Sequence, residues 1–143
     1  MILYQVGALG AMLDAKRVPL NHIKPHGELF FYMQRDLAIM EAVIRACAVF
    51  KVPVFGSKGT DSQGAMCAKY GLQFVEEAYV DLHRRLSIGL VNTVEDNEGS
   101  TINLGFDKKP FLFCIHSDMP TALVNAKACR KGIHEINMKR GWH

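Results

Sequence analysis

The chain has 143 residues, 49% of them hydrophobic and 22% charged, which is enough to bury the core of one ordinary domain. Its formal net charge is +3 and its basic residues are spread along the sequence, so we expect no nucleic-acid-binding surface. The sequence has no signal peptide and no apolar run near the ~18 residues of a membrane helix, and its four cysteines form no CxxC pair. We therefore expect a cytoplasmic protein with free thiols and no membrane contact.

Hydrophobic spacing and turn residues predict the first elements of the chain. Apolar residues recur every three or four positions over residues 2–16, which predicts a helix that Pro19 closes. Residues 20–23 are typical of a first strand, and Lys24–Gly27 of a sharp turn, because its proline and glycine disfavour a continuing strand. Asp36 is expected to begin a second helix. The buried face of that helix is predicted to consist of Leu37, Met40, Val43, Ile44, Cys47 and Ala48.

The remaining elements alternate between strands and helices. In chain order we expect a strand at 52–55, a loop at 56–59, a helix through 65–70 that ends at Gly71, a strand at 72–75, a strand at 111–115, and a helix from 121 through 129 that ends at Gly132. Residues 82–110 give no clear pattern. Because strands that alternate with helices form parallel sheets, the sequence predicts an α/β fold with a parallel sheet.

Ionisable residues follow three of the four predicted strands. They are Lys24 and His26 after the first, Glu77 and Asp81 after the third, and His116 and Asp118 after the last. Because the carboxyl ends of parallel strands share one edge of the sheet, we expect these side chains to converge there. Each also has a structural explanation: a histidine held by hydrogen bonds, a helix-capping Asp118 or a solvated Glu77.

The residue types at this edge suit hydrolytic chemistry. His26 or His116 could act in general acid–base catalysis, and Asp81 or Asp118 could activate water. Lys24 is suited to binding an oxyanion or a phosphate. A histidine together with an aspartate could also hold a divalent metal ion, whose identity the sequence leaves open.

Four segments of the chain, taken together and in this order, match motifs of a known protein family. They are Tyr4–Leu9, His22–Leu29, Phe74–Asp81 and Cys114–Ala122. Together they resemble the LamB/YcsF family of lactam utilisation proteins, which are described as the A subunit of the prokaryotic-type 5-oxoprolinase. The Lys-Pro-His-Gly element and the His-x-Asp before a helix are its most specific parts. The resemblance implies part of a distorted β/α barrel of the glycoside hydrolase and deacetylase kind.

The same resemblance implies an activity, partners and site residues. Family members are expected to open the lactam of 5-oxoproline to glutamate with ATP hydrolysis, in a complex with partner subunits B and C. Carried over onto this sequence, the family motifs imply catalytic positions at Lys24, His26, Asp81, His116 and Asp118, and substrate contacts at Glu77 and Gly27.

Family members are longer than this chain, so we expect residues 1–143 to be a single LamB/YcsF-like domain that lacks the amino-terminal strands. A full β/α barrel takes about 200 residues or more, and the predicted strands are too few to close one. Unpaired strand edges invite pairing with another chain, so we expect a homo-oligomer; a monomer by light scattering at high concentration would contradict this.

Two further functions stay open from the sequence. One is a non-catalytic α/β fragment that acts as a binding module. The other is a metal-dependent, deacetylase-like carbohydrate hydrolase, which would need an acidic amino-terminal motif that this sequence lacks.

Overall fold

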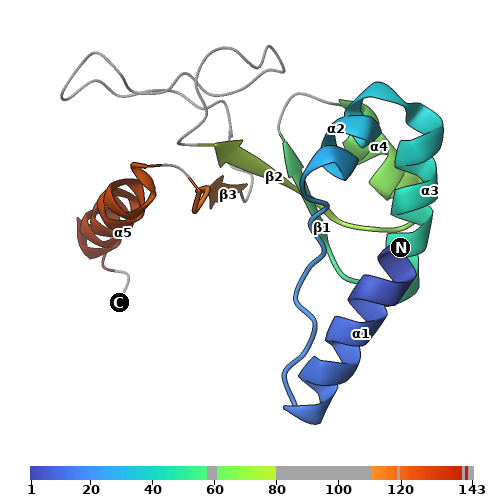
Figure 1. The fold of residues 1–143 in the computed structure, drawn as a ribbon. Helices are drawn as coiled ribbons and strands as arrows, with labels where there is room; N and C mark the ends of the chain where they lie inside the picture. Colours follow the sequence, from blue (N-terminus) through green and yellow to red (C-terminus); the bar gives the residue numbers. More distant parts are fainter. Residues whose placement is uncertain (58–60, 80–110, 119, 140, 142–143) are drawn as a thin grey trace. The chain divides into compact units, whose positions relative to one another are not determined.

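The structure is a computed structural model that describes residues 1–57, 61–79, 111–118, 120–139 and 141 (Figure 1). The chain divides into two compact units, Met1–Glu77 and Ala78–His143, and each is described by itself. The elements are α1 (Ile2–Ala15), α2 (Glu28–Arg35), α3 (Leu37–Cys47), the 3₁₀ turn η1 (Ala48–Phe50), β1 (Val54–Ser57), α4 (Asp61–Lys69), β2 (Phe74–Tyr79), β3 (Phe111–Cys114) and α5 (Ala122–Lys139).

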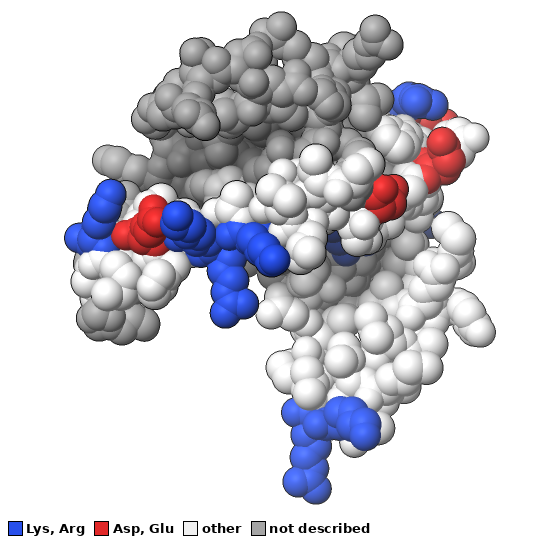
Figure 2. Space-filling view, turned by 60° about the vertical axis from the view of Figure 1, so that its left-hand side comes forward, with Lys and Arg blue, Asp and Glu red and all other residues white. Residues whose placement is uncertain are grey.

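The first helix forms as predicted, but its apolar residues do not all face the core. Ile2 and Val6 pack against the core of the first unit. Leu3, Leu9 and Met12, which belong to the apolar pattern that predicted this helix, are exposed. On the face that Figure 2 shows, the surface over this helix is largely uncharged, with basic side chains beyond its carboxyl-terminal end.

The predicted first strand is wrong in length. Residues 20–23 contribute only an isolated parallel bridge between Ile23 and Val54. Two backbone hydrogen bonds make it: the Ile23 N–H donates to Pro53 O at 2.9 Å, and the Phe55 N–H donates to Ile23 O at 3.0 Å. Pro25, which has no N–H donor, follows directly and prevents the ladder from continuing.

The turn after this bridge leads into a helix that the sequence pattern did not reveal. Gly27 adopts φ 61° and ψ −146° before α2, a conformation that only glycine adopts without strain. Helix α2 has only eight residues, fewer than the roughly 11–18 over which apolar periodicity is read, and of its residues only Met33 is fully buried. The start of α3 was predicted correctly: Asp36 Oδ1 accepts hydrogen bonds from the N–H groups of Ala38 and Ile39, at 2.8 and 3.2 Å.

The buried face of α3 largely matches the prediction. Met40, Val43, Ile44 and Cys47 are buried, whereas Leu37 is exposed. Helices α2, α3 and α4 lie on one side of the paired strands β1 and β2 (Figure 1). The core of the first unit fills the space between these layers, and its buried residues are Ile23, Met33, Met40, Val43, Ile44, Cys47, Val54, Cys67 and Leu72.

The parallel sheet was predicted, but both strands of the first unit run further along the chain than expected. Strands β1 and β2 pair in parallel from Val54 opposite Phe74 to Ser57 opposite Glu77. The strand order is β1-β2-β3, and the described strands form an open sheet. Ser57 and Glu77, which the sequence placed in loops, therefore lie inside strands because each pairs with the other.

Helices α1 and α4 end in the same pattern of hydrogen bonds. After α1, the Arg17 N–H donates to Asp14 O at 2.9 Å and the Val18 N–H to Leu13 O at 3.0 Å, a Schellman motif. The equivalent position after α4 is Gly71, with φ 69°, which confirms the predicted end of that helix. Arg17 occupies the left-handed region at φ 56°, where glycine would be favoured.

The second unit contains β3 and α5. Strand β3 ends one residue earlier than predicted, and α5 begins close to the expected position. The prediction that Gly132 ends the last helix is wrong, since α5 continues to Lys139. A glycine inside a helix costs only about 1 kcal/mol relative to alanine, and the ion pair between Lys131 and Glu135 (3.8 Å) spans this position.

The described residues thus form an α/β fold with a parallel sheet, as predicted. Within them, none of the helices combines the length and apolar character that crossing a membrane requires.

Candidate functional site

An ion pair joins two of the predicted site residues. Lys24 Nζ lies 2.9 Å from Glu77 Oε1, and their side chains are only 14% and 4% exposed. Lys24 directly follows the Ile23 bridge, and Glu77 lies opposite Ser57 in the register of β1 and β2. The expectation that the strand ends bring these side chains together is therefore confirmed for this pair.

The ion pair lies on the sheet face opposite the helices. Side chains alternate between the two faces of a strand, and Ile23 and Val54 point into the helical core. Lys24 and Phe55, one position further along, therefore point to the other face. The stacked rings of His22 and Phe55, with centroids 3.9 Å apart and planes 6° from parallel, agree with this assignment.

Strand β1 passes between the two ends of the ion pair. Its Val54 pairs with Ile23 along one edge and with Phe74 of β2 along the other. Adjacent strands are about 4.8 Å apart, so Lys24 and Glu77 can meet only by reaching across β1 near its carboxyl end. The residue of β1 that lies in the same row as Glu77 is Ser57.

Ser57 is a residue of this site that the sequence reasoning missed. Its side chain is almost fully buried, at 2% exposure, and its Oγ has no hydrogen-bond partner among the described residues. A buried polar group without a hydrogen-bond partner lowers the free energy of unfolding by about 1–3 kcal/mol. Such groups are uncommon in native proteins, and each needs an explanation. The sequence marks only the segment Gly56–Gly59, as a glycine-rich turn after a strand that could meet a phosphate but is too short to be specific.

The amide groups of two glutamines support β1 from the helical side. Gln63 of α4 is completely buried, and its Oε1 accepts a hydrogen bond from Gln34 Nε2 of α2 at 3.0 Å. A Cβ on Gly56 would lie 2.6–2.9 Å from three atoms of the Gln63 side chain. Glycine at position 56 therefore lets this glutamine pack directly against the strand that carries Ser57.

The other predicted site residues are placed as follows. His26 and Gly27 lie in the exposed turn before α2. His116 is half-buried and Asp118 exposed, both just after β3 in the second unit. Asp81 lies outside the described residues. The catalytic and substrate-binding roles of all these residues stay predictions.

The described residues do not supply a metal centre. Among them, no group of three or more histidine, cysteine or acidic side chains is arranged to hold a metal ion. Two thiols of the core are also unsuited to catalysis: burial raises the pKa of Cys47 to about 11 and that of Cys67 to about 12.

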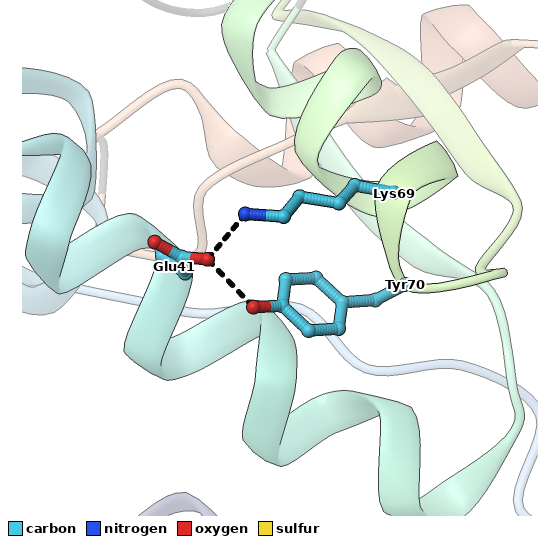
Figure 3. A network of polar contacts seen from close by, with 3 residues as sticks. All are labelled: Glu41, Lys69 and Tyr70. Carbon is cyan, nitrogen blue, oxygen red and sulfur yellow. Dashed lines mark hydrogen bonds and ion pairs between the residues drawn. The ribbon is translucent and has the colours of Figure 1, made fainter.

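A second polar cluster ties α3 to α4 at the opposite end of α4 from Ser57. Lys69 Nζ and Tyr70 Oη both donate to Glu41 Oε1 at 2.6 Å (Figure 3). These hydrogen bonds lower the pKa of Glu41 and raise the pKa values of Lys69 and Tyr70. The cluster is on the surface, and we interpret it as a polar contact that stabilises the packing of α3 against α4.

The comparison with known protein families agrees with the motifs around Lys24. The sequence model of the LamB/YcsF family matches residues 1–92, which is more than half of the chain. The chain belongs to the LamB/YcsF family. The matched range includes Lys24, Ser57 and Glu77, so this site lies inside the family region.

Individual relatives of this LamB/YcsF chain carry lactam-related names. A lactam utilization protein from Emericella nidulans is 31% identical over 98% of this chain and 64% of its own length. A protein named as the A subunit of 5-oxoprolinase, from Thermus thermophilus, is 28% identical over 96% of this chain and 64% of its own length. A protein of the same name from Vibrio parahaemolyticus is 36% identical over 57% of this chain and 33% of its own length.

A solved structure supports the fold. The crystal structure of a lactam utilization protein from Thermus thermophilus superposes with a TM-score of 0.69 and 24% identity, over 95% of this chain and 63% of the other. At this identity the likeness shows the fold alone. The chain spans about 64% of the length of the first two relatives above.

Proposed function

We propose that this chain takes part in the hydrolysis of a small lactam, 5-oxoproline or a close analogue, as the A subunit of an ATP-dependent enzyme. The names of its relatives, which refer to lactam utilization and to one subunit of 5-oxoprolinase, support the substrate class and the need for further subunits. The observation that carries the proposal is the buried ion pair of Lys24 and Glu77 at the carboxyl edge of the sheet. Parallel-sheet proteins bind their ligands at this edge.

The chemistry required is the addition of water to the lactam carbonyl and cleavage of the ring C–N bond, which gives an amine and a carboxylate. The Lys24 ammonium is a cation with several N–H donors, and its side chain is held at the sheet edge by Glu77. We assign Lys24 to the carboxylate of the substrate, with Glu77 holding the ammonium in place. His26, in the adjacent exposed turn, is our candidate for proton transfer to the ring nitrogen.

ATP enters the proposal through the family resemblance. ATP hydrolysis would drive the opening of the unstrained lactam ring. A divalent metal ion would accompany ATP as its counter-ion. We propose a cytoplasmic location for this activity, and partners similar to the B and C subunits of 5-oxoprolinase.

The test is release of glutamate from 5-oxoproline in the presence of ATP. The chain would be assayed alone, with candidate B and C subunits, and with those subunits after His26→Ala or Lys24→Met. We expect activity only with the partners, and its loss in both variants. Lys69→Met, which removes a lysine of the surface cluster around Glu41, is the matched control and should retain activity.

The alternative function that the sequence leaves open is a non-catalytic module that binds the same partners. Co-elution with the B and C subunits, without glutamate release from folded protein in any mixture, would support this function and contradict the first.

A further inference from the structure

The strongest unexplained feature of the site is the Ser57 hydroxyl. It is buried and without a hydrogen-bond partner among the described residues, although it lies on the same sheet face as Lys24 and Glu77. Because the ion pair reaches across β1 at this point, the hydroxyl lies next to the place where a ligand of Lys24 would be held. An unpartnered buried group in a native protein needs an explanation, and a catalytic role is one of those known.

We infer that Ser57 is a ligand-contacting residue whose hydroxyl donates a hydrogen bond to the carbonyl oxygen of the bound lactam. This inference rests on the function proposed above. Two groups of 5-oxoproline could meet the hydroxyl, the carboxylate and the lactam carbonyl. The substrate carboxylate is assigned above to the Lys24 ammonium, which carries the positive charge of this site. The lactam carbonyl is therefore the group left for the Ser57 hydroxyl, which lies beside Glu77 in the sheet register.

The role of this contact follows from the reaction. When water adds to the lactam carbonyl, negative charge develops on the carbonyl oxygen. A hydroxyl donor fixed in a buried position stabilises that charge more effectively than water does, because it does not have to reorient. Burial of Ser57 and the support of β1 by Gln63 both limit such movement. Loss of one donor of this kind lowers kcat by about 100-fold or more.

The first experiment measures binding and does not require the partner subunits. 5-Oxoproline would be titrated into the full chain by calorimetry, with proline as the matched probe, since proline has the ring and the carboxylate but no lactam carbonyl. In Ser57→Ala we expect the affinity for 5-oxoproline to fall about tenfold, the change that a lost hydrogen bond of about 1.4 kcal/mol produces. Ser57→Thr, which keeps a hydroxyl, should retain most of the affinity.

Two controls separate this role from a structural one. Ser62→Ala removes an exposed hydroxyl at the start of α4 and should leave binding unchanged. The thermal midpoint of Ser57→Ala should equal or exceed that of the unchanged chain, because the hydroxyl it removes has no partner among the described residues. The weak binding of proline should be the same in all serine variants.

The binding results for Lys24→Met and Ser57→Ala test the lactam site and the role of Ser57 separately. If Lys24→Met, shown to be folded by circular dichroism, abolishes binding of 5-oxoproline and Ser57→Ala leaves it unchanged, the role of Ser57 is wrong and the lactam site stands. If the unchanged chain and all variants fail to bind 5-oxoproline, both are wrong. Equal loss of 5-oxoproline and proline binding in Ser57→Ala would place the hydroxyl at the carboxylate and overturn the assignment to the carbonyl.

Discussion

Replacing Lys24 by methionine should destabilise the first unit strongly, because it leaves the Glu77 carboxylate buried beside an apolar side chain. At the observed separation of 2.9 Å and an effective dielectric constant near 20, the attraction between the two charges is about 6 kcal/mol. Desolvation of both charged groups offsets most of this, so the intact pair contributes little net stability. Removing Lys24 takes away the ion pair that offsets the desolvation of the buried Glu77 carboxylate, and we expect a loss of about 3 kcal/mol.

The same reasoning predicts the outcome of a double-mutant cycle. Glu77→Gln removes the remaining charge, so Lys24→Met with Glu77→Gln should be more stable than Lys24→Met alone by about 2 kcal/mol. Native-state hydrogen exchange at core amides such as that of Ile44 measures the stability of the first unit directly.

The control for this cycle is the exposed ion pair between Lys69 and Glu41, whose side chains are 59% and 38% exposed. Lys69→Met should cost much less than Lys24→Met, since solvent screens the charge that it leaves behind. Equal losses in the two single variants, or no recovery in the Lys24→Met, Glu77→Gln double variant, would refute the reasoning about burial.

Three further predictions concern packing, a helix end and pH. Gly56→Ala should destabilise the chain by about 1–2 kcal/mol, because the new Cβ would displace the buried Gln63 side chain. Gly10→Ala, which has open space around it, should instead stabilise α1 by about 0.5–1 kcal/mol. If urea unfolding shows that Gly56→Ala stabilises the chain, the packing of Gln63 against Gly56 is wrong. Arg17→Gly should raise the thermal midpoint, with a gain of about 0.5–1 kcal/mol, because it relieves a left-handed conformation at a helix end; an unchanged or lower midpoint would contradict this. The pKa of Glu41 in the folded chain lies below the ordinary value of 4.5. The ionised Glu41 carboxylate therefore contributes its full stabilisation at pH values above 4.5, and this contribution is lost as the pH falls through the lowered pKa. A Glu41→Gln variant should accordingly lose less stability on acidification than the unchanged chain, and equal losses in acid titrations of the two chains, followed by circular dichroism, would refute this.

Local sequence signals determine some features of this fold, and the pairing of distant strands determines others. The start of α3 could be predicted because Asp36 caps it through hydrogen bonds to residues two and three positions away. The end of α4 could be predicted because Gly71 has the backbone freedom that this turn needs. Helix α2 was missed because its eight residues are too few for apolar periodicity to be read with the usual window.

The candidate site also depends partly on local sequence signals and partly on strand pairing. Lys24 and Glu77 were found in the sequence as ionisable residues near strand ends, which is a property of composition and order. Ser57 was not found, because nothing in a Gly-Ser-Lys-Gly segment distinguishes a loop from the end of a strand. It belongs to the site only because β1 pairs with β2 in a register that sets it beside Glu77.

The sequence by itself determined the helices with strong local signals, the alternation of strands and helices, the parallel sheet and the family of this chain. These depend on interactions between residues close together in the chain, or on motifs read directly from it. Only the tertiary structure decided the strand boundaries, the contact of Lys24 with Glu77 and the packing of Gln63 on Gly56. Each of these joins residues that are distant in sequence, and their geometry is set by strand register and by the space between packed layers.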